Sequence, residues 1–170
     1  MTSSLQKPEP RSWRIANIAC WFVILALGAW RAWASRFFMN PDGVSYLDIG
    51  DAFWRGHWPA VFNCYWSPVY PLLLGLVLKL THPSIAWQFA VVHGTNLFIY
   101  IVSAASLSFL LSEIRRARAA AGPQPDFLAW SITVAGYVLF LHTSLIMISI
   151  HQVTPDLLLS AFIYLAAALQ

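Results

Sequence analysis

The residues best suited to chemistry lie in one polar stretch, residues 36–66, of an otherwise largely apolar chain. This stretch is rich in Trp, Tyr and Phe, and it contains Asp42, Asp48 and Asp51, three of the seven acidic residues. Asp42 stands in a Pro-Asp-Gly sequence, which is typical of a turn or of a helix N-cap. The same carboxylate at a membrane surface could act as a general base. The residues alone leave both interpretations of Asp42 open.

Asp48 and Asp51 are three positions apart, so on a helix their carboxylates share one face. Two carboxylates at that spacing could hold a divalent cation, or they could form a solvated face. Cations that could pair with a lipid phosphate occur in and after the same stretch, although cations are ordinary at membrane edges. They are Arg36, Arg55, His57 and Lys79.

Polar side chains also interrupt the apolar runs that follow. His93 and Asn96 are three positions apart in one run, and His142 lies in the next. Ionisable groups within a membrane span suggest a functional site, but His and Asn also form hydrogen bonds between helices in many bundles. His151 and Asp156 come after the run that contains His142, and the predicted topology places them on the same side of the membrane as the polar stretch.

The elements that must position these residues are apolar helices. The 170 residues are 59% hydrophobic and only 10% charged, whereas a soluble domain carries about 25% charged residues. The basic residues stand in short clusters beside apolar runs, as membrane orientation requires, and their pattern does not suggest nucleic-acid binding. The sequence therefore predicts an all-α fold. We expect a polytopic membrane helical bundle of about four transmembrane helices, whose outer loop carries short interfacial helices.

The apolar runs set the expected boundaries. We expect transmembrane helices over 13–35, 84–112 and 127–150, and the start of a fourth over 157–170 that is too short to cross. The connecting segments are a disordered cytoplasmic tail (1–12), an extracytoplasmic loop (36–83) with interfacial helices near 43–55 and 68–80, a cytoplasmic loop (113–126) and an outer turn (151–156). The chain is therefore expected to be the N-terminal piece of a longer protein. An alternative for the first span is a secretory signal cleaved after its Ala-Trp-Ala sequence.

The distribution of arginines sets the expected orientation. The apolar segment 68–80 has 13 residues and is too short to span comfortably. If it crossed, the arginines of the Glu-Ile-Arg-Arg-Ala-Arg sequence after the second span would lie outside, against the positive-inside tendency. The segment is therefore expected to lie flat in the interface. This places the N-terminus in the cytoplasm of a multi-pass protein of the bacterial inner or plasma membrane.

Several short motifs together resemble a known superfamily. An outer loop opening with Asp is followed by an aromatic stretch, the segment SPVYPLLLGLVLKL, a span ending in EIRRAR and a span closing in a TPD turn. Over roughly residues 10 to 170 this order resembles the N-terminal part of the GT-C superfamily of polytopic glycosyltransferases. It is more narrowly similar to the protein-mannosyltransferase and aminoarabinose-transferase-like branch.

The resemblance implies roles for particular residues. Asp42 matches the acidic residue of the family's first loop, the proposed base. Tyr70 lies in the segment that matches the family's Pro-Leu-Tyr sequence, and Asp156 ends a turn that matches its Arg-Pro-Asp turn. The resemblance implies that both residues bind the substrate or its phosphate. Two positions depart from the pattern: Gly43 stands where many relatives have a second acidic residue, and Thr154 stands where they have Arg.

The second departure removes the cation to which the family pattern would assign phosphate binding. The replacements that the sequence offers are Arg36, Arg55, Lys79 and His151. The first departure puts a paired-carboxylate or metal site in doubt, so no cofactor is expected, although a divalent cation is possible.

The resemblance implies an enzyme that transfers a sugar from a polyprenyl-phosphate donor to an acceptor on the outer membrane face, by an inverting displacement. Its partners would be the lipid-linked sugar and membrane lipids, with no nucleic acid. The alternative is a non-enzymic membrane protein, a scaffold or transporter segment, with the aromatic loop as an interfacial platform.

Overall fold

The computed structural model of the chain describes residues 11–62, 65–122, 125–148 and 150–170. Most of the expected N-terminal tail and Cys64 of the polar stretch lie outside these residues. The described residues form helices joined by turns, with no strand among them. This confirms the predicted all-α class.

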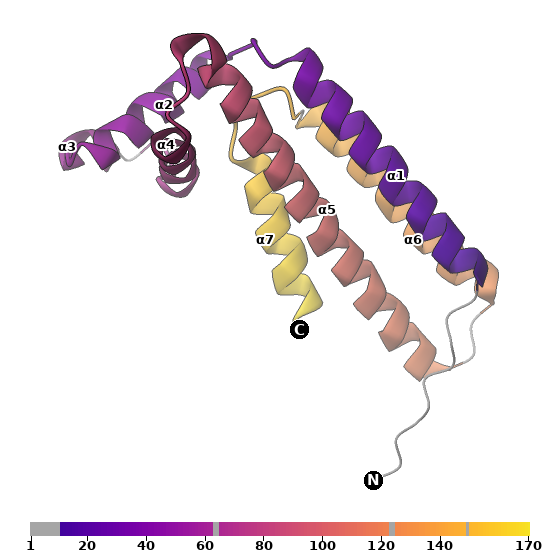
Figure 1. Cartoon of the computed structure of the whole chain (residues 1–170). Helices are drawn as coiled ribbons and strands as arrows, with labels where there is room; N and C mark the ends of the chain where they lie inside the picture. Colours follow the sequence, from indigo (N-terminus) through magenta and orange to yellow (C-terminus); the bar gives the residue numbers. More distant parts are fainter. Residues whose placement is uncertain (1–10, 63–64, 123–124, 149) are drawn as a thin grey trace.

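The helices follow one another along the chain as labelled in Figure 1. They are α1 (Arg11–Ala34), α2 (Pro41–Trp54), α3 (Trp58–Val61), α4 (Val69–Thr81), the 3₁₀ turn η1 (Ile85–Trp87), α5 (Gln88–Ala121), α6 (Asp126–His142), the π-helical segment η2 (Thr143–Met147) and α7 (Asp156–Ala168).

Three stretches of helix are long and apolar enough to cross a membrane: Trp13–Ala34, Ile85–Ala121 and Trp130–Met147. They confirm a helical membrane bundle. The sequence predicted about four transmembrane helices. The fourth is represented by α7, which has 13 residues, fewer than the roughly 20 that a spanning helix needs.

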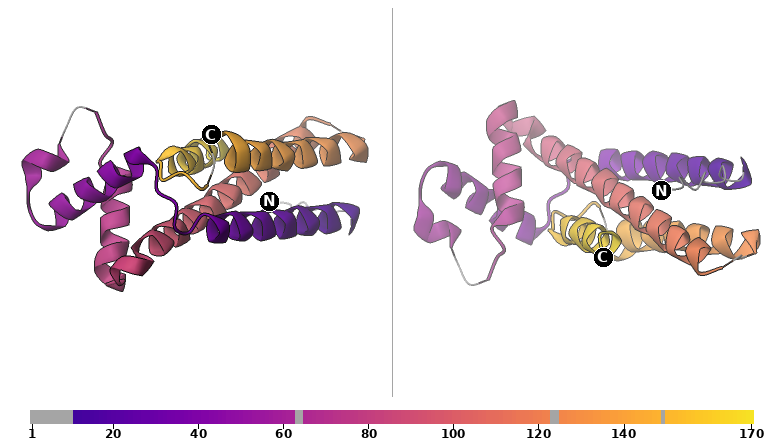
Figure 2. Two further views of the ribbon diagram at one scale, coloured as in Figure 1. Left: turned by 90° about the horizontal axis from the view of Figure 1, so that it is seen from above. Right: turned by 90° about the horizontal axis from the view of Figure 1, so that it is seen from below.

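The long helices pack in pairs around a shared core. Helix α1 lies beside α6, and α7 runs back along α5 (Figures 1 and 2). Tyr100 of α5 is fully buried, and its hydroxyl donates a hydrogen bond of 3.0 Å to the backbone oxygen of Ile24 in α1. Gly28 of α1 faces the same ring, and a Cβ at that position would overlap it. The absence of a side chain at Gly28 therefore lets α1 and α5 approach.

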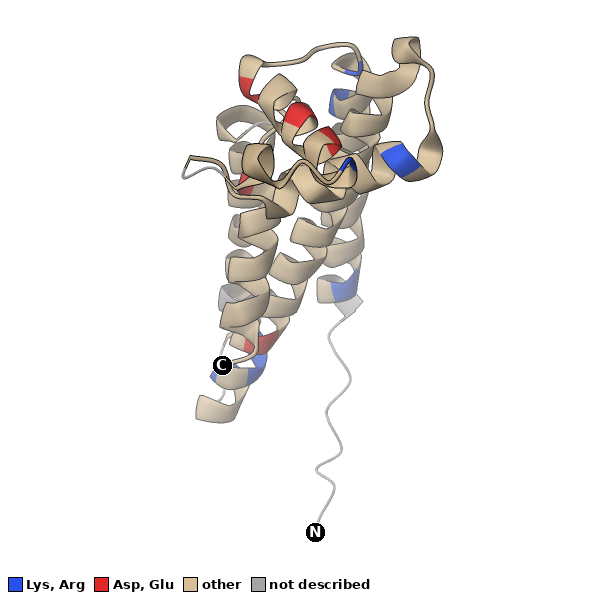
Figure 3. Cartoon of the chain, turned by 90° about the vertical axis from the view of Figure 1, so that its left-hand side faces the viewer, with Lys and Arg blue, Asp and Glu red and all other residues tan. Residues whose placement is uncertain are grey.

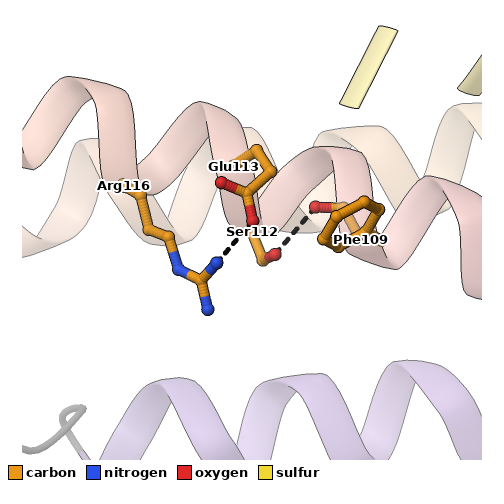
Figure 4. Close-up of polar contacts among 4 residues, drawn as sticks. All are labelled: Phe109, Ser112, Glu113 and Arg116. Atoms are coloured by element: carbon orange, nitrogen blue, oxygen red, sulfur yellow. Dashed lines mark hydrogen bonds and ion pairs between the residues drawn. The ribbon is translucent and has the colours of Figure 1, made fainter. Parts of the chain in front are cut away.

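Helix α5 is longer than the sequence predicted. Residues 113–126 were expected to form a loop, but α5 continues to Ala121 and ends at Gly122. Ala and Arg are strong helix formers, and no Gly or Pro interrupts them before Gly122. In this last part Arg116 pairs with Glu113, and Ser112 bonds back to the Phe109 carbonyl oxygen (Figure 4).

The start of α1 and the end of α5 lie at the same end of the bundle. The guanidinium of Arg115 stacks over the ring of Trp13 at 3.7 Å from its centroid. A cation over an aromatic face is attracted by the ring quadrupole. The contact ties the basic end of α5 to the beginning of α1.

Helices α2, α3 and α4 form a cap at the opposite end of the bundle, which we call the loop end (Figure 1). Helix α4 runs crosswise to the long helices rather than along them (Figures 1 and 2). It packs against α2 where Gly50 meets Gly75, and a Cβ on Gly50 would lie 2.6 Å from the Pro71 carbonyl oxygen. Helix α4 stops at His82, which adopts a left-handed conformation with φ 44° before Pro83.

Charged residues gather at the two ends of the bundle (Figure 3). The acidic residues of the loop end are concentrated on α2. The middle of each long helix carries none: α1 has no charged residue between Arg14 and Arg31, and α5 has none from its start to Glu113. The charged side chains of the described helices therefore lie at the ends of the bundle.

Candidate functional site at the loop end

Asp42 is exposed in the first turn of α2. The helix begins there because Pro41 occupies its first position, where a missing N–H costs no helical hydrogen bond. A carboxylate in the first turn is also stabilised by the helix dipole. Asp42 therefore stabilises the start of α2, and its carboxylate remains accessible from solvent.

A hydrogen bond of Asn40 joins the start of α2 to the turn before α7, which is distant in the sequence. As the residue before α2, Asn40 does not cap the helix with its side chain. Its Oδ1 instead accepts a 2.8 Å hydrogen bond from the backbone N–H of Val153, in the turn before α7. The segment containing Asp42 is therefore held directly against the turn that leads to Asp156.

Gly43 is required by this contact. A Cβ at Gly43 would lie 2.9 Å from the Val153 Cβ and 3.1 Å from the Asn40 Oδ1. Both distances are too short for a larger side chain without displacing the turn. The packing therefore accounts for a glycine at position 43, and it excludes a carboxylate pair at positions 42 and 43.

A buried hydrogen-bond network lies beneath the helix start. The hydroxyl of Tyr70 in α4 donates a hydrogen bond of 2.7 Å to Oδ1 of Asn96 in α5. The Asn96 amide in turn donates a hydrogen bond of 3.2 Å to the backbone oxygen of Gln152. Tyr70 is only 1% exposed. Burial raises the pKa of Tyr70 above its ordinary value. Tyr70, predicted to contact substrate, is therefore positioned to hold α4, α5 and the turn together.

Tyr46 lies close enough to both Asp42 and Asp156 for their charges to affect its pKa. Its ring packs edge-on against Tyr70 at 5.2 Å and against Trp66 at 4.8 Å. Burial raises the pKa of Tyr46 most, and the negative charges of Asp42 and Asp156 raise it further. Asp156 is exposed in the first turn of α7, as Asp42 is in α2. Two helix starts thus present carboxylates near the same phenol.

The predicted phosphate-binding cations of the polar stretch are engaged locally. Arg36 donates a hydrogen bond of 2.8 Å to the Trp33 carbonyl oxygen, and its guanidinium stacks over the Trp33 ring. Arg55 pairs with Asp51 at 2.8 Å on an exposed face of α2. Lys79 lies over a tryptophan ring of α2, 4.7 Å from its centroid. None of these three contacts involves Asp42 or Asp156.

His151 contacts a cation that the sequence analysis did not select. Arg31, at the end of α1, lies 3.1 Å from Nδ1 of His151. Since a guanidinium has only donors, Nδ1 must accept, and His151 is neutral in this contact. Burial lowers the pKa of His151, and the positive charges of Arg31 and His93 lower it further. The Phe38 ring packs on the imidazole at 5.5 Å.

His93 contacts the same loop residue, Phe38, that packs on His151. It is 1% exposed, and its Nε2 donates 2.8 Å to the Phe38 carbonyl oxygen. Its Nδ1 is buried and has no hydrogen-bond partner in the part of the chain that the structure describes. His142, the other histidine predicted within a span, is exposed on the outside of α6. His93 therefore joins α5 to the loop before α2, whereas His142 takes no part in this contact.

Sequence reasoning missed Arg31 because its partner lies 120 positions away. In the sequence, Arg31 stands at the end of an apolar run, where a cation ordinarily reaches the membrane interface. One signal could have selected it: no acidic residue occurs within ten positions on either side of Arg31. Such a cation cannot pair locally on its own helix.

Comparison of the chain with models of protein families, with curated proteins and with solved structures found no match. The site therefore has to be interpreted from its own geometry. Among the described residues, no three His, Cys, Asp or Glu side chains are close enough together to hold a metal ion. The α2 start and the turn before α7 do bring together the exposed carboxylates of Asp42 and Asp156, the neutral imidazole of His151 and the guanidinium of Arg31.

The lowered pKa of His151 predicts a pH-dependent stability. Its folded-state pKa lies below the ordinary value of 6.5, so the unfolded chain binds more protons between these two values. Stability should therefore fall as the pH drops through 6.5 toward the folded-state pKa. We expect the midpoint of thermal unfolding in detergent to decrease between about pH 7.5 and pH 5.

His151→Asn should reduce this pH slope, because its amide oxygen can still accept from Arg31 but does not titrate. His142→Asn, at an exposed position of α6, serves as the matched control and should leave the slope unchanged. An unchanged slope in His151→Asn would contradict the assignment.

Proposed function

We propose that the chain belongs to a membrane glycosyltransferase of the GT-C type, which transfers a sugar from a polyprenyl phosphate to an acceptor at the outer membrane face. The loop end is then extracytoplasmic, and the N-terminus lies in the cytoplasm of a bacterial inner or plasma membrane. The observation that carries the proposal is the Asn40–Val153 hydrogen bond of 2.8 Å. It holds the Asp42 helix start against the turn that carries His151 and leads to Asp156.

Asp42 is assigned the role of general base. The acceptor hydroxyl oxygen attacks the anomeric carbon, and the Asp42 carboxylate takes the hydroxyl proton as the new glycosidic bond forms. The bond between the anomeric carbon and the phosphate oxygen breaks at the same time, so the configuration inverts. The electron pair leaves with the oxygen as polyprenyl phosphate.

The leaving phosphate needs positive charge rather than a proton donor. Arg31 is the cation that supports this role best, because it lies beside His151 in the turn that Asn40 fastens. Arg36, Arg55 and Lys79 have other contacts and are less suited. The lipid tail confines the donor to headgroup depth, which removes much of the entropic cost of bringing the reactants together.

One observation favours the non-enzymic alternative. Large aromatic side chains of α2, α3 and the following loop are exposed, as an interfacial platform requires. They include Trp54, Trp58, Phe62 and Tyr65, which are between 37% and 81% exposed. A scaffold that only rests on lipid would need these rings but would not need Asp42.

A transfer assay separates the two functions. The protein expressed from its complete gene is purified and given polyprenyl-phosphate sugars with a labelled sugar, together with a membrane extract as acceptor. We expect label to pass from the lipid donor to an acceptor and none to pass from soluble nucleotide sugars. A panel of pentosyl and hexosyl lipid donors that yields no transfer, with the protein folded and inserted, would overturn the proposal in favour of the platform.

A further inference from the structure

Arg31 carries a charge that the described residues do not neutralise. No described carboxylate lies within 4.0 Å of its guanidinium. By contrast, Arg55 pairs with Asp51 and Arg116 pairs with Glu113. Its side chain contacts His151, and its Nε is buried without a hydrogen-bond partner. A partly buried, unpaired cation at a membrane edge is costly unless an anion compensates it.

An apolar groove begins at this cation. Its volume is about 400 Å³, and it is lined by Leu27, Trp30 and Arg31 of α1 and by Leu145 and Ile146 of η2. The π-helical turn places Leu145 and Ile146 opposite α1. Four of the five lining residues are apolar, and the fifth is the unpaired arginine. The groove therefore combines an apolar wall with one positive charge at its loop end.

This combination matches the chemistry of a phospholipid. We propose that the groove binds an anionic diacyl phospholipid, with its phosphodiester on the Arg31 guanidinium and one acyl chain against Leu27, Trp30 and Ile146. The phosphate accepts the guanidinium hydrogen bonds that no carboxylate takes. From Leu27 to Arg31 α1 rises about 6 Å, which suits the first methylene groups of an acyl chain.

Charge complementarity selects a phosphodiester over a phosphomonoester. His151 is neutral where it accepts from Arg31, so the groove offers a single positive charge. A phosphodiester carries one negative charge, whereas a phosphomonoester carries about 1.5 to 2 at neutral pH. This binding site lies between α1 and η2. It shares Arg31 with the proposed sugar transfer, whose lipid donor is also a phosphodiester, so the phospholipid and the donor would compete for this cation. Binding of the phospholipid does not itself require sugar transfer.

The test measures lipid binding to the purified, delipidated protein by native mass spectrometry. Phosphatidylglycerol and phosphatidylcholine are titrated separately, and dioleoyl chains are used in both. We expect phosphatidylglycerol to bind more tightly. Arg31→Gln, which keeps an amide donor but removes the charge, should weaken phosphatidylglycerol binding about tenfold.

Two further variants keep the result interpretable. Arg36→Gln removes a neighbouring cation that stacks on Trp33, and it should bind phosphatidylglycerol like the wild type. Ile146→Trp changes a side chain that is 63% exposed, so folding should persist while the larger ring fills the groove and weakens binding. Unchanged binding in Ile146→Trp, equal losses in both arginine variants, or equal affinity for the two phospholipids would overturn the proposal. Tighter binding of a polyprenyl phosphate monoester than of phosphatidylglycerol would also overturn it.

Discussion

Asn96→Leu is expected to lower the free energy of unfolding by about 1–4 kcal/mol, the largest stability loss that the site predicts. The substitution leaves the Tyr70 hydroxyl without its acceptor and the Gln152 carbonyl oxygen without its donor. A buried polar group that loses its partner costs roughly 1–3 kcal/mol, which applies to the Tyr70 hydroxyl. The carbonyl of the exposed residue Gln152 adds less, because water can replace its lost donor. The measurement is thermal or denaturant unfolding in detergent at neutral pH.

Thr95→Val is the matched control for Asn96→Leu. Thr95 is the preceding residue of α5 and is also buried, but its hydroxyl bonds only to the Val91 carbonyl oxygen of the same helix. Its replacement should cost less than about 1 kcal/mol. A similar loss in both variants would show that the helix, rather than the network between α4, α5 and the turn, is sensitive.

A double-mutant cycle tests the Tyr70–Asn96 bond itself. Tyr70→Phe alone should destabilise the protein, because the Asn96 Oδ1 then loses its donor. In the Asn96→Leu background the same change should cost much less, since the hydroxyl has no acceptor to lose. Additive losses would contradict the bond as the source of stability.

The sequence was sufficient to predict the membrane helices because long apolar runs have few other structures in lipid. A helix was also predicted from about residue 43, with Asp42 in a turn or at the N-cap. The structure begins this helix at Pro41, so Asn40 is the N-cap residue and Asp42 lies in the first turn. The extension of α5 to Ala121 was missed because Arg115, Arg116 and Arg118 were weighed as topology signals. Their high helix propensity, together with that of the neighbouring alanines, continues the helix beyond the apolar run.

The contacts of the site could not be predicted in the same way. Arg31 and His151 are 120 positions apart, and Asn40 and Val153 are 113 apart. No local pattern pairs such residues, because their proximity depends on how four segments pack at the loop end. Tyr70 illustrates the result: its motif suggested contact with substrate, but tertiary packing buries it against Asn96.

Gly43 shows how the absence of a side chain beside a candidate catalytic residue can have a packing origin. Sequence comparison by motif presents it as a missing carboxylate. The structure shows that the Val153 side chain and the Asn40 amide occupy the space that any side chain at this position would need. The same contact that excludes a second carboxylate fixes the helix start that carries Asp42. The site is thereby left with a single carboxylate at this position.

Asp42→Asn is expected to reduce the rate of sugar transfer by about 10²- to 10⁴-fold. An amide has nearly the same shape as the carboxylate but cannot accept the acceptor's proton. Because Asp42 is exposed in the first turn of α2, the fold should persist. The lost interaction with the helix dipole should cost only about 0.3–1 kcal/mol. The measurement is the initial rate of label transfer from the polyprenyl-phosphate donor, with thermal unfolding recorded on the same preparation.

Asp48→Asn is the matched control, because Asp48 is an exposed carboxylate on the same helix and nearly two turns further along. It should transfer sugar at the wild-type rate, since the charge of α2 changes equally in both variants but only Asp42 lies at the end fastened by Asn40. Wild-type transfer in Asp42→Asn would remove this residue from the mechanism. Equal losses in the two variants would assign the effect to the overall charge of α2, because a base must act from one position.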